Sequence, residues 1–418
     1  MNTVLYQKIQ HYMQKKKWNQ SDLSNNTGIH FSDISRILNH KQPLSLKKLD
    51  EITKAFGLME GSLYSYFVQE CLSDNKYAEK QRCIQFLYKC AVYGFEKEFH
   101  ELLRLMMEET SHITRSKYMT YIFSVAEMLF AAGKREKALP LYEEIIENTS
   151  DHFSEQLAIS HFRKFYMISM TEEGNHALTY VLEHLPYMPR GVRREAYLWI
   201  TAGYYRRQEW NKVLHNAQAL ERISSEDSYF GRALMYKSFA LMRLGAPLDT
   251  VLTFIDQYAQ VNEFFADIAV GNRYIVLLDY GRLEYVDEYL IWLEEREDVY
   301  VGLPRVLEAY VYLCRLDDAT RLIERFRHVI EDMAVSKEPW LKQKMYWDFR
   351  YAHALYRFKR NQFSKGLDEL LDVAEAANQI RNMERLKQCL QVYWEYRSYA
   401  TTEHEVKYKQ LLSSKECN

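Results

Sequence analysis

A short segment near the amino end carries side chains that can read DNA bases. In the run "FSDISRIL" (residues 31–38), the spacing of Ile34, Ile37 and Leu38 predicts a helix with one buried face. Four side chains lie on its outward face: Phe31, Ser32, Ser35 and Arg36. Arginine can form a forked hydrogen bond with guanine, serine can bond a base or a phosphate, and an aromatic ring can meet the thymine methyl group. This pattern predicts a helix that enters the major groove of double-stranded DNA.

The flanking sequence supplies the elements that must position this helix. Residues 20–27 are predicted to form a preceding helix, and Gly28 provides the left-handed turn residue between the two. After a loop containing Pro43, the segment "SLKKLDEITKAFGL" spaces apolar residues to close a small core: Leu46, Leu49, Ile52 and Phe56. Two helices joined by a glycine turn and followed by closing helices form a helix-turn-helix arrangement.

The distribution of charge agrees with a nucleic-acid contact at this end. Residues 1–59 contain nine Lys or Arg and four Asp or Glu, a net charge of +5, although the whole chain carries −2. A basic head on an acidic body favours DNA binding by the head. The alternative is a helical module that has lost DNA binding and serves only for dimerisation. The basic balance and the presence of Arg36 argue against that alternative.

The head resembles the Xre or lambda-repressor-type family over nearly its whole length. The resemblance rests on these residues: Trp18, Gln20, Leu23, Gly28, Ile29, Ile34, Ser35, Arg36, Asn39, Pro43, Leu49 and Ile52. It implies that Gln20 and Asn39 hold phosphates on either side of the reading helix, helped by Lys41. The sequence departs from the family at His30, where a serine-type cap is usual, and at His40, where glycine is common. These departures put individual residue roles in doubt and leave the fold unaffected.

A second pattern fills the remaining 350 residues. An aromatic-rich helix, a turn and a second helix recur, and the small or β-branched positions of the second helices can be aligned. These positions are Phe99, Ala138, Ala177, Val213, Thr250, Val286, Ala319 and Gly366. Successive positions lie 33–39 residues apart, except for 47 residues before the last one. This period is typical of tetratricopeptide-like repeats, which curve into a right-handed superhelical array with a concave groove.

These patterns predict an all-α protein with three parts. Residues 1–66 form the helix-turn-helix DNA-binding domain, residues 67–400 form a repeat sensor of about eight helix pairs, and residues 401–418 form a capping helix. Only 14 Gly and 7 Pro interrupt 418 residues, which also favours helices.

The sequence shows no pattern of catalytic residues. It lacks HExxH, GxSxG and a GxGxxG after a strand, and its 13 His are scattered. We therefore expect no enzymatic activity, no cofactor and no metal. The amino end lacks the apolar region of a signal peptide, and no apolar stretch reaches 18 residues, so we expect a cytoplasmic protein without membrane contact. The six cysteines include no CxxC pair and are expected to be buried thiols.

A repressor-type head followed by a tetratricopeptide-like array resembles the peptide-pheromone receptors of Gram-positive bacteria and their phages. This group includes PlcR, NprR, PrgX, Rgg and the arbitrium receptors. The stretch "VQECLSDNKYAEKQRCIQFLYKCAVYGFEKEF" is most similar to the arbitrium receptors. The resemblance implies a transcription regulator that binds a short linear peptide in its groove and binds a two-fold DNA operator as a homodimer.

The groove itself is consistent with a peptide ligand, because rows of side chains on a curved array can clamp an extended backbone. Repeat position predicts that nine residues face the groove: Tyr205, Arg206, Arg232, Arg243, Asn272, Asp279, Glu308, Tyr312 and Tyr351. Asparagine and arginine can bond peptide carbonyls, and Asp279 or Glu308 can pair with a basic peptide side chain.

Two other functions stay open. One is an enzyme or enzyme-modulator like the related Rap phosphatases, which act on response regulators but carry a helical bundle where this chain has a basic head. The array can also serve as a scaffold that recruits another protein, with DNA binding secondary.

Overall fold

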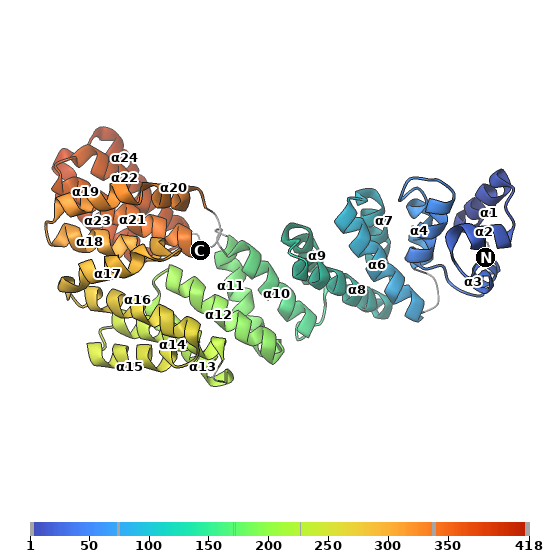
Figure 1. The fold of residues 1–418 in the computed structure, drawn as a ribbon, viewed down its shortest axis with the longest axis horizontal. Coiled ribbons are helices and arrows are strands. Elements are labelled where there is room, and N and C mark those ends of the chain that lie inside the picture. Colours follow the sequence, from blue (N-terminus) through green and yellow to red (C-terminus); the bar gives the residue numbers. More distant parts are fainter. Residues whose placement is uncertain are drawn as a thin grey trace. The chain divides into compact units, whose positions relative to one another are not determined.

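The computed structural model describes residues 4–72, 76–169, 171, 173–225, 227–336 and 340–413. In this part of the chain every regular element is an α-helix or a short 3-10 turn, which confirms the predicted all-α fold (Figure 1). The chain divides into two compact units, Met1–Met167 and Ile168–Asn418.

The first unit begins with the four helices of the head and continues with longer helices. They are α1 (Val4–Lys16), α2 (Gln20–Thr27), α3 (Phe31–Leu38), α4 (Leu46–Ala55), α5 (Tyr64–Cys71), α6 (Lys76–Tyr93), α7 (Glu96–Met107), α8 (His112–Ala131), α9 (Arg135–Asn148) and α10 (Glu155–Ile168). The predicted helices at residues 20–27 and 31–38 are confirmed at both ends.

Local signals explain why the head folds as predicted. The side chain of Asn19 accepts hydrogen bonds from the backbone N–H groups of Ser21 and Asp22, which caps the start of α2. Gly28 ends α2 with a φ of +72°, a conformation that glycine adopts without a steric penalty. The apolar residues predicted to form the small core are all buried: Ile34, Ile37, Leu38, Leu46, Leu49, Ile52 and Phe56.

The head packs directly on the helices that follow it. One apolar core runs from Leu5 to Ile145 and includes residues of α5 and α6. The hydroxyl of Tyr64 donates to Asp50 Oδ1 at 2.6 Å, and Lys89 Nζ lies 2.7 Å from Asp50 Oδ2. The predicted domain boundary at residue 66 therefore falls inside α5. That residues 1–66 bind DNA and the following residues act as a sensor stays a prediction.

The second unit consists of helices that follow one another in antiparallel pairs. They are α11 (Glu173–His184), α12 (Arg190–Arg206), α13 (Trp210–Ile223), α14 (Ser228–Arg243), α15 (Leu248–Ala259), α16 (Glu263–Asp279), α17 (Val286–Glu294), α18 (Leu303–Tyr312), α19 (Leu316–Arg325), α20 (Arg327–Val335), α21 (Trp340–Lys359), α22 (Phe363–Gln379), α23 (Met383–Tyr396) and α24 (Thr402–Ser413). Of the predicted capping segment, residues 414–418 lie outside the described residues.

The eight aligned repeat positions all fall on the second helix of a pair. These helices are α7, α9, α11, α13, α15, α17, α19 and α22. The long interval before Gly366 arises because α20 is inserted between α19 and α21. Gly366 is small for a steric reason, since a Cβ there would lie 2.6 Å from the Phe358 ring. In α15 the predicted repeat position is wrong by one residue. Thr250 is exposed, and Val251 is the residue that is buried at this position of the repeat.

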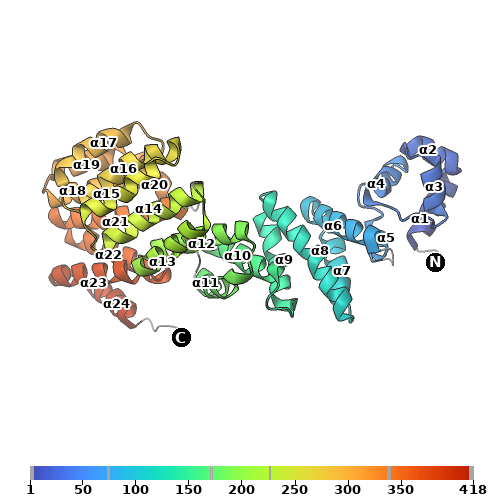
Figure 2. The same cartoon turned by 90° about the horizontal axis from the view of Figure 1, so that it is seen from below.

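The array of the second unit curls back on itself, so that its early helices touch its late ones. The side chain of Asn382, at the start of α23, donates to the backbone oxygen of Arg206, at the end of α12, at 3.2 Å. The ring of Tyr205 lies 6.5 Å from that of Trp340 in α21. Figure 1 and Figure 2 show the two groups, α12–α16 in green to yellow and α18–α23 in orange to red. The first helices of the pairs thus share one inner face.

Two expectations about the whole chain can be compared with this fold. Among the described residues, no helix combines the length and the apolar character needed to span a membrane. Cys71, Cys83, Cys90 and Cys389 are buried as expected, but Cys314 is exposed because it lies in the turn after α18. Cys417 lies outside the described residues.

Candidate nucleic-acid interface and inner-face cluster

The outward face of α3 is available for contact with another molecule. The side chain of Phe31 is 48% exposed, Ser32 and Arg36 are exposed, and Ser35 is half-buried. The opposite face is fixed in the core of the head, so α3 can present these side chains in one orientation. The backbone oxygen of Arg36 accepts from Lys41 and Gln42, but its side chain forms no hydrogen bond or ion pair with any residue that the structure describes. The guanidinium group is therefore free to bind a base.

The two histidines that depart from the family pattern have structural explanations. His30 replaces the expected serine as the amino-terminal cap of α3, because its Nδ1 accepts from the backbone N–H of Ser32 at 3.3 Å. His40 adopts a φ of +56°, the conformation for which glycine is common at this place. Its ring packs edge-on against Tyr6 of α1, with 4.3 Å between ring centroids. These contacts keep the helix-turn-helix geometry despite the unusual residues.

The residues that are predicted to contact phosphates lie at the two ends of the α2–α3 unit. Gln20 is half-buried at the first position of α2, and Lys41 is exposed after α3. The side-chain amide of Asn39 donates to the backbone oxygen of Ser35 at 2.8 Å and thereby closes the end of α3. The roles of these residues toward phosphates stay predictions.

One ion pair fixes α3 against α4. Lys48 Nζ lies 2.8 Å from Asp33 Oδ2, and this hydrogen bond lowers the pKa of Asp33. The negative charge of Asp33 is therefore balanced by Lys48, so that it repels DNA less than an unpaired carboxylate would.

A second site forms on the inner face of the second unit, where seven charged side chains meet. We call it the inner-face cluster, and its members are Arg243, Asp279, Arg305, Glu308, Lys344, Asp348 and Arg385. They come from α14, α16, α18, α21 and α23. The carboxyl ends of α14 and α16 meet α18 and the amino-terminal halves of α21 and α23 there.

Asp279 connects the first half of the cluster. Its carboxylate lies 2.8 Å from Arg243 Nη2 and 3.3 Å from Arg305 Nε. Arg305 also binds Glu308, with 2.9 Å between Nη1 and Oε2. Burial by itself lowers the pKa of Arg305, but the carboxylates of Asp279 and Glu308 outweigh this effect and raise the pKa. Arg305 is therefore held in its charged form.

Asp348 connects the second half of the cluster. Its carboxylate lies 2.6 Å from Lys344 Nζ and 2.9 Å from Arg385 Nη2. Burial alone would raise the pKa of Asp348, but the two cations hold it well below its usual range. The carboxylate is consequently ionised throughout the physiological pH range.

Aromatic rings pack against the cations of the cluster. Lys344 Nζ lies 5.1 Å from the ring centroid of Tyr205, and the Arg385 guanidinium lies 4.2 Å from that of Tyr351. Burial raises the pKa of Tyr351, so its hydroxyl stays protonated. The neighbouring Tyr312 is 69% exposed and offers both a ring and a hydroxyl group to a ligand.

The structure brings together most of the predicted groove residues. Three of them belong to the cluster, namely Arg243, Asp279 and Glu308, while Tyr205 and Tyr351 pack on its cations. Repeat position did not predict the other four members: Arg305, Lys344, Asp348 and Arg385. These four residues share a position in the repeat. Each lies in the first half of the first helix of its helix pair.

Three predicted groove residues make other contacts. Arg206 is buried, its side chain donates to a backbone oxygen between α10 and α11, and burial lowers its pKa to about 10. Arg232 lies over the ring of Phe264, with 5.0 Å to the centroid. Asn272 donates to the hydroxyl of Tyr258 at 2.9 Å. These contacts stabilise the array, and contacts with a peptide stay predictions for all three.

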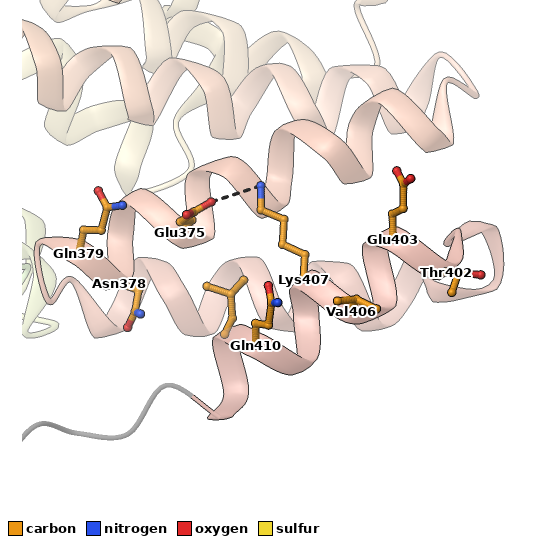
Figure 3. Close-up of a pocket in the computed structure, with 9 residues that line it drawn as sticks. Glu375, Asn378, Gln379, Thr402, Glu403, Val406, Lys407 and Gln410 are labelled. Carbon is orange, nitrogen blue, oxygen red and sulfur yellow. Dashed lines mark ion pairs between the residues drawn. The ribbon is translucent and has the colours of Figure 1, made fainter.

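Two hollows lie away from all of these residues. One, of about 520 Å³, lies between α22 and α24, and Figure 3 shows Lys407 reaching across it toward Glu375 at 3.3 Å. Another, of about 740 Å³, lies beside α20–α22 and contains His353 and Glu369. Within the described ranges, no group of three or more His, Cys, Asp or Glu side chains is arranged to hold a metal ion.

A helix-turn-helix head joined to an all-helical repeat array defines the class of the protein as a DNA-binding regulator with a repeat body. Residues 8–68 match the family model of the Cro/C1-type HTH DNA-binding domain, which confirms the predicted head. This architecture fits the PlcR- and Rgg-type regulators that the sequence resembles.

The chain shows at most a distant similarity to the individual proteins with which it was compared. None of the curated proteins matches the sequence. Among solved structures, a Rap protein complexed with competence and sporulation factor is similar with a TM-score of 0.43 and 13% identity, over 79% of this chain and 99% of the other. A likeness of this size assigns neither a ligand nor site residues to the present chain.

Proposed function

We propose that the protein is a transcription regulator whose binding to a DNA operator is controlled by a short signalling peptide of five to ten residues. The peptide binds at the inner-face cluster of the second unit. The observation that carries this proposal is the convergence of charged and aromatic side chains from six first helices, α12, α14, α16, α18, α21 and α23, on one inner face.

The signs of these charges support a binding role. Helix ends favour anions at the amino terminus and cations at the carboxyl terminus. Asp279 is the last residue of α16, whereas Arg305 and Arg385 are third residues of α18 and α23, so all three carry the disfavoured sign. Such charges also cost desolvation energy when buried. Their presence is better explained by a ligand than by the stability of the helices.

The composition of the cluster suits a free peptide. Four cations face three carboxylates, and a free peptide presents a carboxylate and an ammonium group together with backbone amides. Asp279 already pairs with Arg243 and Arg305, so a basic peptide side chain would have to compete with both. Within the described part of the chain, Glu308 forms an ion pair with Arg305 and with no second cation, and we therefore favour Glu308 as the partner of such a side chain.

Control of the operator requires that the peptide bind two arrangements of the protein with different affinity. One head covers one half-site, so we propose that the protein acts as a homodimer on a two-fold operator. Peptide and operator then affect each other's affinity by the same factor.

The test is isothermal titration of the full-length protein with synthetic peptides encoded beside its gene. Asp279→Asn should weaken peptide binding about tenfold or more, because the carboxylate that orders Arg243 and Arg305 loses its charge. The matched control is Glu284→Gln, which removes an ion pair with Arg282 whose two side chains are each more than half exposed. That control should bind peptide like the wild type.

Labelled operator DNA provides the second half of the test. A saturating peptide should change operator affinity in the wild type and have a smaller effect in Asp279→Asn at the same concentration. Failure of every candidate peptide to bind, together with binding to a response regulator, would contradict the proposal and favour a Rap-like modulator.

A further inference from the structure

The amino-terminal cap of α3 places a histidine beside a residue that we expect to read DNA. His30 Nδ1 lies 3.3 Å from the backbone N of Ser32 and 2.8 Å from its side-chain Oγ. The hydroxyl of Ser32 makes no other hydrogen bond with a residue that the structure describes. Ser35, the other serine on this face, lies 3.4 Å from the Asn39 amide instead. The geometry therefore isolates His30 and Ser32 as a pair.

The two contacts together determine which atom donates. The backbone N–H of Ser32 can only donate, so it donates to the Nδ1 lone pair of the neutral imidazole whose proton is on Nε2. In this tautomer Nδ1 cannot donate to Oγ, and the 2.8 Å contact runs from the Ser32 hydroxyl to Nδ1. The single hydroxyl hydrogen of Ser32 is thus directed back at His30, and the outward side of Oγ presents lone pairs.

We infer that His30, as the neutral imidazole with its proton on Nε2, makes Ser32 a hydrogen-bond acceptor toward DNA and thereby selects adenine or cytosine at the base that Ser32 contacts. In the major groove only adenine N6 and cytosine N4 offer donors, whereas guanine and thymine present acceptors at the corresponding edge. A serine without such a partner can rotate its hydroxyl and bond either kind of base. This inference rests on the proposed DNA binding, and His30 acts in it as a positioning residue.

The experiment selects binding sites from random DNA duplexes with the full-length protein and then measures competition among single-base variants of the selected site. One position should favour adenine or cytosine by about two- to twelvefold, the range expected for one net hydrogen bond. Ser32→Ala should abolish the preference at that position alone. His30→Ala should reduce it below about twofold, because the freed hydroxyl can also donate to guanine or thymine.

His30→Asn is the matched variant that separates this role from simple capping. The protein already uses an asparagine cap in α2, where Asn19 Oδ1 accepts from two backbone N–H groups. An asparagine at position 30 keeps an acceptor beside Ser32, so the base preference should persist. The preference at the base read by Arg36 should stay the same in all variants and reports that α3 is folded.

Three results would overturn the inference. They are an unchanged preference in His30→Ala, a wild-type preference for guanine or thymine at the Ser32 position, and a uniform loss of preference at every position in His30→Ala. The last result would mean that His30 acts only through the folding of α3. If the wild type enriches no sequence at all, DNA reading itself is rejected, and the proposed function falls with it.

Discussion

Replacing Asp348 by asparagine removes one negative charge from the centre of the inner-face cluster and keeps the size of the side chain. In the wild type this carboxylate lies between Lys344 and Arg385 at 2.6 Å and 2.9 Å. The three side chains are only 11–13% exposed. The variant therefore leaves two cations close together in a region with little water to screen them.

The magnitude follows from the burial of the group. Removing one partner of a fully buried ion pair costs about 3–5 kcal/mol. A tenth of each side chain stays accessible here, so we expect the lower end of that range, about 3 kcal/mol. For a unit of this size, such a loss lowers Tm by about 6–12 °C.

The effect should also depend on pH in a defined direction. The pKa of Asp348 is held well below its usual range, so its contribution to stability is complete above the unfolded-state pKa of about 3.9. It is lost as the pH falls from there toward the folded-state pKa. The difference in Tm between wild type and Asp348→Asn should consequently be constant from about pH 8 to 5 and should shrink below about pH 4.

Thermal unfolding followed by far-UV circular dichroism measures both effects. The control is Asp317→Asn, which removes an ion pair with Arg360 on the surface, where the Asp317 side chain is 84% exposed. Water screens a pair this exposed, so this control should lose much less in Tm than Asp348→Asn. Equal losses in the two variants would refute the argument that the cluster is desolvated.

Two further predictions concern DNA binding and assembly. Arg36→Ala should weaken operator binding by about 1–3 kcal/mol and relax specificity at one base, whereas Lys41→Ala should weaken all sequences alike and lower the slope of the salt dependence by about one, both measured by fluorescence anisotropy. Unchanged operator affinity in Arg36→Ala would show that α3 does not face the groove. The full-length protein should sediment as a dimer at micromolar concentration, and a monomer there would count against a two-fold operator complex.

The helix-turn-helix head could be predicted in detail because its signals are local. The buried positions of α3 follow a helical period, and Gly28 ends α2. The eight repeat positions fall on second helices, although the register is off by one residue at Thr250. The function of His30 was not predicted, since only the three-dimensional distances show that its ring replaces a serine cap and holds the Ser32 hydroxyl.

The inner-face cluster was predicted only in part, and the reason is the range of its contacts. Repeat register placed Asp279 and Glu308 on the inner face, but it could not show that Asp279 is already neutralised by Arg243 and Arg305. The sequence by itself determined which elements form, because a helix depends on neighbours three and four residues away. The tertiary structure decided which charges meet, because the curvature that joins Arg206 to Asn382 accumulates over many helix pairs and leaves no local signal in the sequence.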